Sequence, residues 1–314
     1  MADMKFKAHQ SFFIRKGWLS KGIRAVERNG AVFMPSNSKE AMDELGLGSN
    51  QVVALRYWLG AIGFMVKAGD NKSHELTPLC KLILERDPYI EEMGTLWAIH
   101  YNLACNKKEA TSWYWFFNRL KAKTFTKSDL AAGIQKYAAQ NNSDGREKTS
   151  KGKALSSIES DIDCILNTYI SHERLGGKPV LPENVIDCPL GDLGILDVDN
   201  RQLRTYRKKP AVSSALPELL VLYAVIGMLS SKRGIDVPVW AEGNEVPLGE
   251  LLLGEFSPGL LYNLDSVVLL GKLYELENDG FLRINRTAGS DVVRLTCPGL
   301  KQEECLSIYY DLIG

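Results

Sequence analysis

Residues 38–85 read SKEAMDELGLGSNQVVALRYWLGAIGFMVKAGDNKSHELTPLCKLILE, and this stretch predicts the fold of the N-terminal part. Its first eight residues predict a short helix capped by Ser38, and the glycines of GLG predict a tight turn. Ser49 or Asn50 then caps a second helix, in which apolar residues recur at helical spacing. FMVKA and HELT, on either side of the polar GDNKS, predict a β-hairpin, and Pro78 begins a further helix.

Helix, glycine turn, helix and hairpin follow one another in the order of a winged helix-turn-helix. The second helix of that motif is the one that enters a DNA major groove. Asn50 and Gln51 are side chains of the type that reads adenine, and Arg56 can reach guanine or phosphate. Lys67 and Lys72 lie on the expected wing. The alternative is a winged helix that contacts another protein.

The same outline recurs near the C-terminus. PLGELLLG and LDSVVLLGKLYELENDG predict helices, and FLRIN and VVRLT predict a hairpin, which suggests a second winged helix and an internal duplication. Its second helix carries Glu275, Glu277 and Asp279 against the single basic Lys272. Phosphates would repel this helix, so it suits packing or dimer contacts better than a DNA groove, and we expect a homodimer.

Helical periodicity also marks residues 89–105, 111–121, 127–140 and 153–171. The expected fold class is therefore mainly α, with winged helix-turn-helix modules at both ends, a helical middle and short β-hairpin wings. The expected domains are residues 1–88, 89–175 and 176–314. The polar stretch 141–153 is the best candidate for a mobile loop or boundary.

The net charge is zero but unevenly distributed. Residues 1–150 hold 22 Lys and Arg against 15 Asp and Glu, so the remaining residues hold 16 against 23. A polyanion should prefer the positive half, although chance drift of surface charge is the alternative. Two basic stretches offer phosphate contacts or simply solvated charges: HQSFFIRKGWLSKGIR, with Arg15 and Lys21, and RQLRTYRKKP, with Arg204 and Arg207.

The aromatic stretch TSWYWFFNRLKAK, residues 111–123, has two interpretations. Its rings could stack on nucleic-acid bases, but aromatics at helical spacing normally pack in a core, and we favour the core. The longest apolar run, Leu219–Leu229, is too short for a membrane span and predicts a buried helix. With a charged start in place of a secretory signal, the expected location is cytoplasmic, away from membranes.

The sequence contains no recognisable catalytic motif, whether a phosphate-binding glycine loop, a serine nucleophile elbow or a zinc-binding pattern. Glu92 and His100 lie eight residues apart on one expected helix and can share a face. They are the candidate catalytic pair, as a general base or as ligands of a divalent metal. A single buried histidine in a core is the more common alternative.

Several long stretches resemble a bacterial family long described as a domain of unknown function, which includes the SspB component of single-stranded DNA phosphorothioation systems. These stretches are HQSFFIRKGWLSKG, LGLGSNQVVALRYWLGAIG, HELTPLCKLILERDPYIEEMGTLWAIHYNLA and TSWYWFFN. The resemblance is firm over residues 5–130 and looser beyond. In the common form of the turn motif a lysine stands where this chain has Ser49, which removes one expected phosphate contact.

The resemblance implies a role in DNA phosphorothioation and phage defence, beside a cysteine desulfurase, a sulfur transferase and an ATPase. Members of this kind are associated with nicking one strand of double-stranded DNA so that sulfur can enter. A nicking endonuclease would need a divalent metal, Mg²⁺ or Mn²⁺. Two alternatives stay open: a non-catalytic DNA-binding adaptor for the sulfur-transfer complex, and a winged-helix transcriptional regulator.

Overall fold

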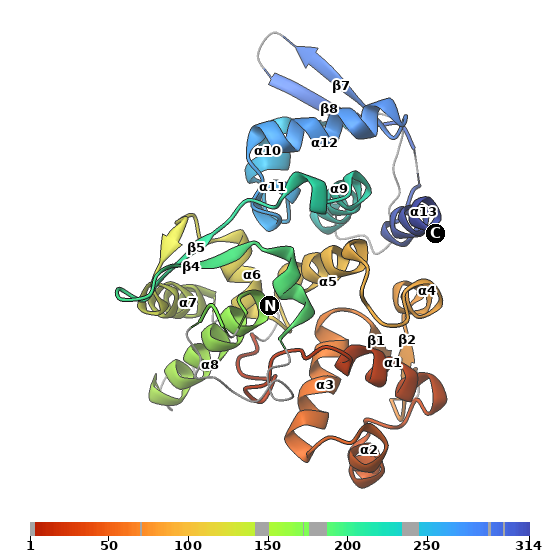
Figure 1. The fold of residues 1–314 in the computed structure, drawn as a ribbon, viewed down its shortest axis with the longest axis vertical. Coiled ribbons are helices and arrows are strands. Elements are labelled where there is room, and N and C mark those ends of the chain that lie inside the picture. Colours follow the sequence, from red (N-terminus) through yellow and green to blue (C-terminus); the bar gives the residue numbers. More distant parts are fainter. Residues whose placement is uncertain are drawn as a thin grey trace. The chain divides into compact units, whose positions relative to one another are not determined.

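The computed structural model describes residues 4–69, 71–141, 151–171, 173–175, 187–233, 245–287, 290–297 and 299–314. Helices dominate these residues, and short antiparallel strands complete the fold (Figure 1), so the expected mainly helical class is confirmed. The chain forms two compact units, Met1–Glu91 with Asn102–Lys209, and Glu92–Tyr101 with Pro210–Gly314. The division into three domains that the sequence suggests stays a prediction. Most of the expected mobile stretch 141–153 lies outside the described residues.

The first unit begins with four helices and one hairpin. They are α1 (Trp18–Arg28), the 3-10 turn Pro35–Asn37, α2 (Ser38–Leu45), α3 (Ser49–Ala61), β1 (Met65–Lys67), β2 (His74–Leu76) and α4 (Pro78–Arg86). Helix α1 packs against α2, α3, β2 and α4. A methyl group at Gly22 of α1 would lie 2.8 Å from Leu59 of α3, so this glycine permits the close approach of the two helices.

The turn between α2 and α3 has the conformation that its glycines predict. Gly46 ends α2 in the left-handed region, with φ of 64°, where a side chain would be strained. The N–H of Leu47 donates to the carbonyl of Met42 at 3.2 Å and closes the last turn of α2. The hairpin after α3 is antiparallel and pairs Met65 with Leu76. The turn between α2 and α3 and the hairpin after α3 are thus determined by residues close to one another in the sequence.

The rest of the first unit packs three helices beside a small sheet. Its elements are α6 (Thr111–Asn118), β3 (Thr124–Phe125), α7 (Lys127–Asn141), α8 (Lys151–Tyr169), the 3-10 helix Pro189–Leu193, β4 (Leu196–Asn200) and β5 (Thr205–Lys208). The sheet order is β3-β5-β4, and α6, α7 and α8 contact one another. All eight residues of α6 are buried, so the expectation that its aromatic stretch forms core is confirmed.

A buried hydrogen-bond network joins the N-terminal segment to α6 and α8. The Asp161 carboxylate of α8 lies 2.8 Å from His9 Nε2 and accepts 2.8 Å from the Lys7 N–H and 2.6 Å from the Ser112 hydroxyl. The His9 ring stacks on Trp58 of α3 at 5.8 Å between centroids. Because His9 and Asp161 are both almost fully buried, neither side chain has water as a substitute partner.

The second unit contains α5 (Met93–Cys105) as far as Tyr101, and the C-terminal elements. These are the 3-10 turn Ser213–Ala215, α9 (Glu218–Arg233), β6 (Glu245–Pro247), α10 (Leu248–Leu253), α11 (Pro258–Leu261), α12 (Ser266–Asn278), β7 (Leu282–Thr287), β8 (Ser290–Leu295) and α13 (Gln302–Ile313). The strand order is β6-β8-β7. Every apolar side chain of Leu219–Leu229 is buried in the hydrophobic core, which confirms the expected buried helix. Helices α12 and α13 pack on α9.

Asp161→Ala should destabilise the protein by about 3–5 kcal/mol, because it leaves His9 and two hydrogen-bond donors buried without their acceptor. Asp163→Ala, two residues along the same helix, removes only an exposed ion pair with Lys127 and should cost less than about 1 kcal/mol. Urea denaturation followed by circular dichroism measures both free energies. Equal losses in the two variants would contradict the central place given to the buried network.

Candidate nucleic-acid interface

The N-terminal end of α3 is exposed to solvent, whereas its C-terminal end is held by a hydrogen bond. At its other end, Asn106 Nδ2 donates to the Ala61 carbonyl at 2.9 Å. Ser49 and Asn50 are exposed in the first turn. The expectation that one of them caps the helix is wrong, since the N-cap is Gly48. The Gly48 N–H instead donates to Gln51 Oε1 at 2.9 Å, so Gln51 turns back to cap the helix.

Arg56 lies one turn further along α3 and is half-buried. Its Nη1 donates to the Phe33 carbonyl at 3.4 Å, so the guanidinium supports the segment that leads into α2. On the hairpin, Lys67 and Lys72 are both exposed. The structure therefore brings Ser49, Asn50 and the two lysines to the surface of one module, whereas Arg56 and Gln51 have structural contacts.

A second group of cations surrounds the start of α1. Arg15 is half-buried, with its guanidinium 5.5 Å from the centroid of the Trp18 ring. Lys21 is exposed and lines a hollow of about 270 Å³. The full lining is Lys16, Gly17, Ser20, Lys21, Arg24, Tyr89 and Glu91. Three cations and one acid thus face one hollow, which favours contact with an anion over contact with a cation.

The contacts within this hollow keep its charges in place. The Arg24 guanidinium lies 5.2 Å from the centroid of the Tyr89 ring, and Lys16 Nζ lies 3.0 Å from a Glu91 carboxylate oxygen. The Ser20 hydroxyl is buried and has no hydrogen-bond partner among the described residues. Sequence periodicity identified the basic residues here but missed Tyr89, because it lies outside that stretch and meets Arg24 only in the folded chain.

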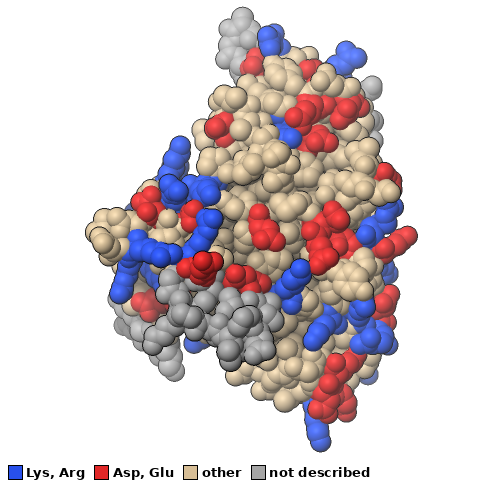
Figure 2. Space-filling model, in the orientation of Figure 1, with Lys and Arg blue, Asp and Glu red and all other residues tan. Residues whose placement is uncertain are grey.

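The hairpin of β4 and β5 is only partly a cationic patch. Arg204 is exposed at its turn, with φ of 52°. Arg207 lies 3.9 Å from Asp197 and 4.0 Å from Asp199, which offset its charge. Figure 2 shows the same mixture, with acidic side chains among the basic ones on the projecting part of the molecule that contains this hairpin. Arg204 is therefore better placed for phosphate than Arg207.

Lys208 of the same basic stretch is not available to phosphate. Its ammonium donates to the carbonyls of Phe116 at 2.9 Å and Leu120 at 3.0 Å, at the end of α6. Burial lowers the pKa of Lys208 to about 7. This lysine thus caps the C-terminus of a buried helix, a role that the sequence does not distinguish from that of its exposed neighbours.

The candidate catalytic pair lies in the second unit. His100 is fully buried, its Nε2 lies 2.8 Å from the Leu261 carbonyl oxygen, and Trp97 and Tyr262 surround its ring. Burial lowers the pKa of His100 to about 4, so the ring is neutral near pH 7. Glu92 precedes the first turn of α5, which begins at Met93 and not at residue 89. These contacts favour a core histidine, and the catalytic assignment stays a prediction.

No group of three or more His, Cys, Asp or Glu side chains that would hold a metal ion occurs among the described residues. The surface of the first unit has an exposed amide at the start of α3 and exposed lysines on the hairpin β1–β2. These groups can bind phosphate and base edges without covalent chemistry.

The fold is that of a mainly helical protein, and the first unit carries exposed lysines and arginines on its surface. The chain belongs to the family described as "Protein of unknown function (DUF4007)", whose model matches residues 6–310. A search of curated proteins finds no match. Within the described residues, no helix is long and apolar enough to cross a membrane.

Two solved crystal structures of SspB, one of them bound to magnesium ion, have the same fold. Each is 24% identical in sequence to this chain and covers 99% of it and 89% of the SspB chain. The TM-scores are 0.83 for the magnesium-bound structure and 0.82 for the other. At this identity the likeness establishes the fold, which extends the resemblance from residues 5–130 to nearly the whole chain.

The burial of His100 predicts a specific loss of stability in acid. Its pKa is near 4 in the folded chain and about 6.5 when unfolded, so the unfolded chain binds more protons between these values. The free energy of unfolding should therefore fall by about 3 kcal/mol through this group as the pH drops from above 6.5 to below 4. Denaturation curves at a series of pH values measure the slope.

His100→Gln is the matched variant, because its amide can still donate to the Leu261 carbonyl but does not titrate. Its stability should depend less steeply on pH than that of the unaltered chain. If both proteins show the same slope between pH 6.5 and 4, His100 is accessible to protons in the folded state and the catalytic assignment regains support.

Proposed function

We propose that the first unit binds double-stranded DNA through a winged helix-turn-helix formed by α1, α2, α3 and the hairpin β1–β2. The order of these elements is that of the motif, and α1 supports both α2 and α3. The observation that carries the proposal is the exposed start of α3, where Asn50 faces solvent, together with the exposed lysines of the hairpin in the same module. In this reading α3 enters the major groove and the hairpin contacts phosphate.

The positions of the side chains suggest two roles, contact with base edges and contact with phosphates. Asn50 is the candidate for reading a base edge, with Ser49 and Gln51 beside it. The cations Lys67, Lys72, Lys21, Arg15 and Arg204 would hold phosphates, each without sequence preference. Arg56 and Arg207 would contribute less. The Arg56 guanidinium donates to the Phe33 carbonyl, and nearby carboxylates offset the charge of Arg207. The set lies wholly in the first unit, whose chain segment up to residue 150 carries the positive balance.

The family resemblance and the shared fold with SspB support a role for this DNA binding in a phosphorothioation and phage-defence system. The partners would be a cysteine desulfurase, a sulfur transferase and an ATPase. The expected location is the cytoplasm, where such a system meets DNA. A transcriptional regulator is a competing role for a winged helix, and it predicts tight binding to one short palindrome rather than to DNA in general.

The second unit has a related order of elements but suits DNA less well. Helices α9, α10 and α12 accompany the sheet β6-β8-β7, as in a winged helix. At the start of α12 the Asp265 carboxylate accepts from the backbone N–H groups of Val267 and Val268. The only lysine of α12, Lys272, is 2.8 Å from Glu275. We propose that this module serves packing or self-association, with sedimentation of the full chain as the test of a homodimer.

Strand nicking is the second candidate function. It is supported by the family resemblance, and the magnesium-bound form of SspB makes Mg²⁺ the first ion to try. No group of three or more metal-binding side chains occurs among the described residues, so we derive no metal-dependent step from them. Supercoiled plasmid incubated with the purified chain and Mg²⁺ or Mn²⁺ distinguishes the roles. Relaxed circles indicate a nickase, and binding with intact plasmid under all conditions indicates a non-catalytic adaptor.

Charge reversal tests the DNA interface. Lys67→Glu and Lys21→Glu should each weaken duplex binding about 10-fold and make it less dependent on salt, since each removes one phosphate contact. Asn50→Ala should weaken binding to a preferred site by about 1–3 kcal/mol and leave non-specific binding nearly unchanged. Fluorescence anisotropy of a labelled 20-base-pair duplex at several salt concentrations measures all three.

Lys108→Glu is the matched control, because Lys108 is an exposed lysine of the same unit outside the proposed interface. It should leave the affinity within about twofold of the original. If all three lysine reversals weaken duplex binding equally, the binding reflects net charge alone and the winged-helix interface is wrong.

A further inference from the structure

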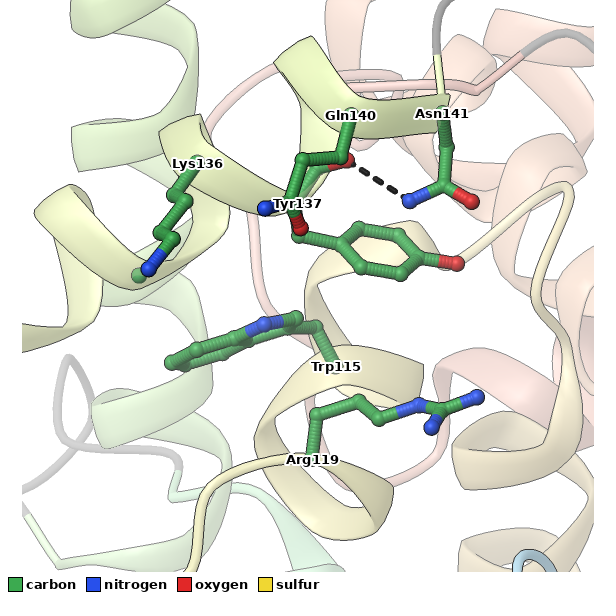
Figure 3. A pocket seen from close by; sticks show the side chains of 7 residues that line it. Trp115, Arg119, Lys136, Tyr137, Gln140 and Asn141 are labelled. Carbon is green, nitrogen blue, oxygen red and sulfur yellow. Dashed lines mark hydrogen bonds between the residues drawn. The ribbon is translucent and has the colours of Figure 1, made fainter.

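A hollow of about 410 Å³ lies between α6 and α7 in the first unit, on residues that the DNA interface does not use. Figure 3 shows its side chains, with Trp115 and Arg119 at the end of α6 facing the side chains of α7. The full lining is Trp115, Arg119, Gly133, Lys136, Tyr137, Gln140 and Asn141. The volume falls in the range of about 300–1,000 Å³ that small-molecule sites occupy.

One aromatic of the buried helix α6 reaches this hollow. Trp113, Tyr114, Phe116 and Phe117 are at most 1% exposed, whereas Trp115 is 9% exposed and lines the hollow. Helix α7 leaves room for this ring through Gly133, where a methyl group would lie 2.3 Å from the indole. The indole is therefore held against the α7 backbone, with Tyr137 of α7 as the second ring of the hollow.

The charged side chains around the two rings, Arg119 and Lys136, are both positive. Arg119 Nε and Nη2 donate to the Tyr114 hydroxyl at 3.1 Å and 2.9 Å, which fixes the guanidinium beside the hollow. Lys136 is exposed on α7. The described lining includes two cations, two side-chain amides and no acid. An anion with an aromatic part fits these groups better than a neutral or a cationic ligand.

We propose that this hollow binds one unstacked nucleotide. The base packs against Trp115 and Tyr137, the phosphate meets Arg119 and Lys136, and the amides at the rim meet the edge of the base. Aromatic rings stack on any base, so the site should tolerate all four bases. The inference rests on the proposed function, since it gives DNA that has lost its pairing a separate place on the same unit. The nucleotide's source is a free mononucleotide or a nucleotide within a single strand.

The test uses the full chain and four probes: deoxyadenosine monophosphate, inorganic phosphate, an eight-residue oligothymidylate, and the fully paired 20-base-pair duplex. Tyr137→Leu should weaken binding of the oligonucleotide about 10-fold through lost stacking. Lys136→Gln should weaken it about 5-fold through lost phosphate contact. Gln135→Ala, at an exposed position of α7 outside the lining, is the matched control and should leave the affinity unchanged.

Tyr137 and Lys136 are both at least partly exposed, so we expect neither substitution to unfold the protein. Thermal unfolding followed by circular dichroism verifies that each variant remains folded. Neither should change duplex binding. Competition by the mononucleotide identifies a free nucleotide as ligand, and binding of the oligonucleotide alone identifies a strand; either result supports the site when the variants weaken it. Inorganic phosphate competing as strongly as the mononucleotide overturns the proposal, because the rings then contribute nothing.

The two proposals can fail separately. Duplex binding that depends on Lys67, together with oligonucleotide binding that ignores Tyr137 and Lys136, overturns the nucleotide site and leaves the DNA interface intact. Oligonucleotide binding that depends on Tyr137 and Lys136 without any duplex binding keeps the site and rejects the winged-helix interface.

Discussion

A carboxylate taken out of water costs several kcal/mol unless donors replace the lost hydration, and the first unit is built around one such group. Asp161 receives its donors from the N-terminal segment and from α6, while His9, which it holds, stacks on α3. The network therefore fixes the α3 module and the α6–α8 core on a shared support. The proposed DNA interface and the proposed nucleotide site both lie on elements that this buried hydrogen-bond network holds in place.

The sequence predicted those parts of the fold whose causes are local. Glycine at position 46, the polar GDNKS between FMVKA and HELT, and the apolar run of α9 each act within a few residues, and the structure shows the expected turn, hairpin and buried helix. The ends of helices were less accurate, because Gln51 competes with Ser49 and Asn50 for the capping role. Helix α13 and strand β6 carried no signal strong enough to be noticed.

The interface could be predicted only in part, since sequence gives the charge of a residue but not its neighbours. Lys208 and Arg204 belong to one basic stretch, yet Lys208 is inserted beneath α6 and Arg204 stands at a turn. The aromatic residues of TSWYWFFN likewise differ in their surroundings in a way that the sequence does not show. Periodicity favoured the core, and four of its rings are core, but Trp115 reaches a hollow that only the approach of α7 at Gly133 creates.

These placements give the first unit two kinds of cationic surface with different physical demands. The cations near α1 and on the wing are spread over several elements, which suits the regularly spaced phosphates of a duplex. Arg119 and Lys136 flank two rings in a confined volume, which suits one base at a time. A paired base cannot present its face to a ring, so the proposed nucleotide site would discriminate against the duplex that is proposed to bind the first surface. Opening of the duplex is thus the event that would transfer DNA from one surface to the other.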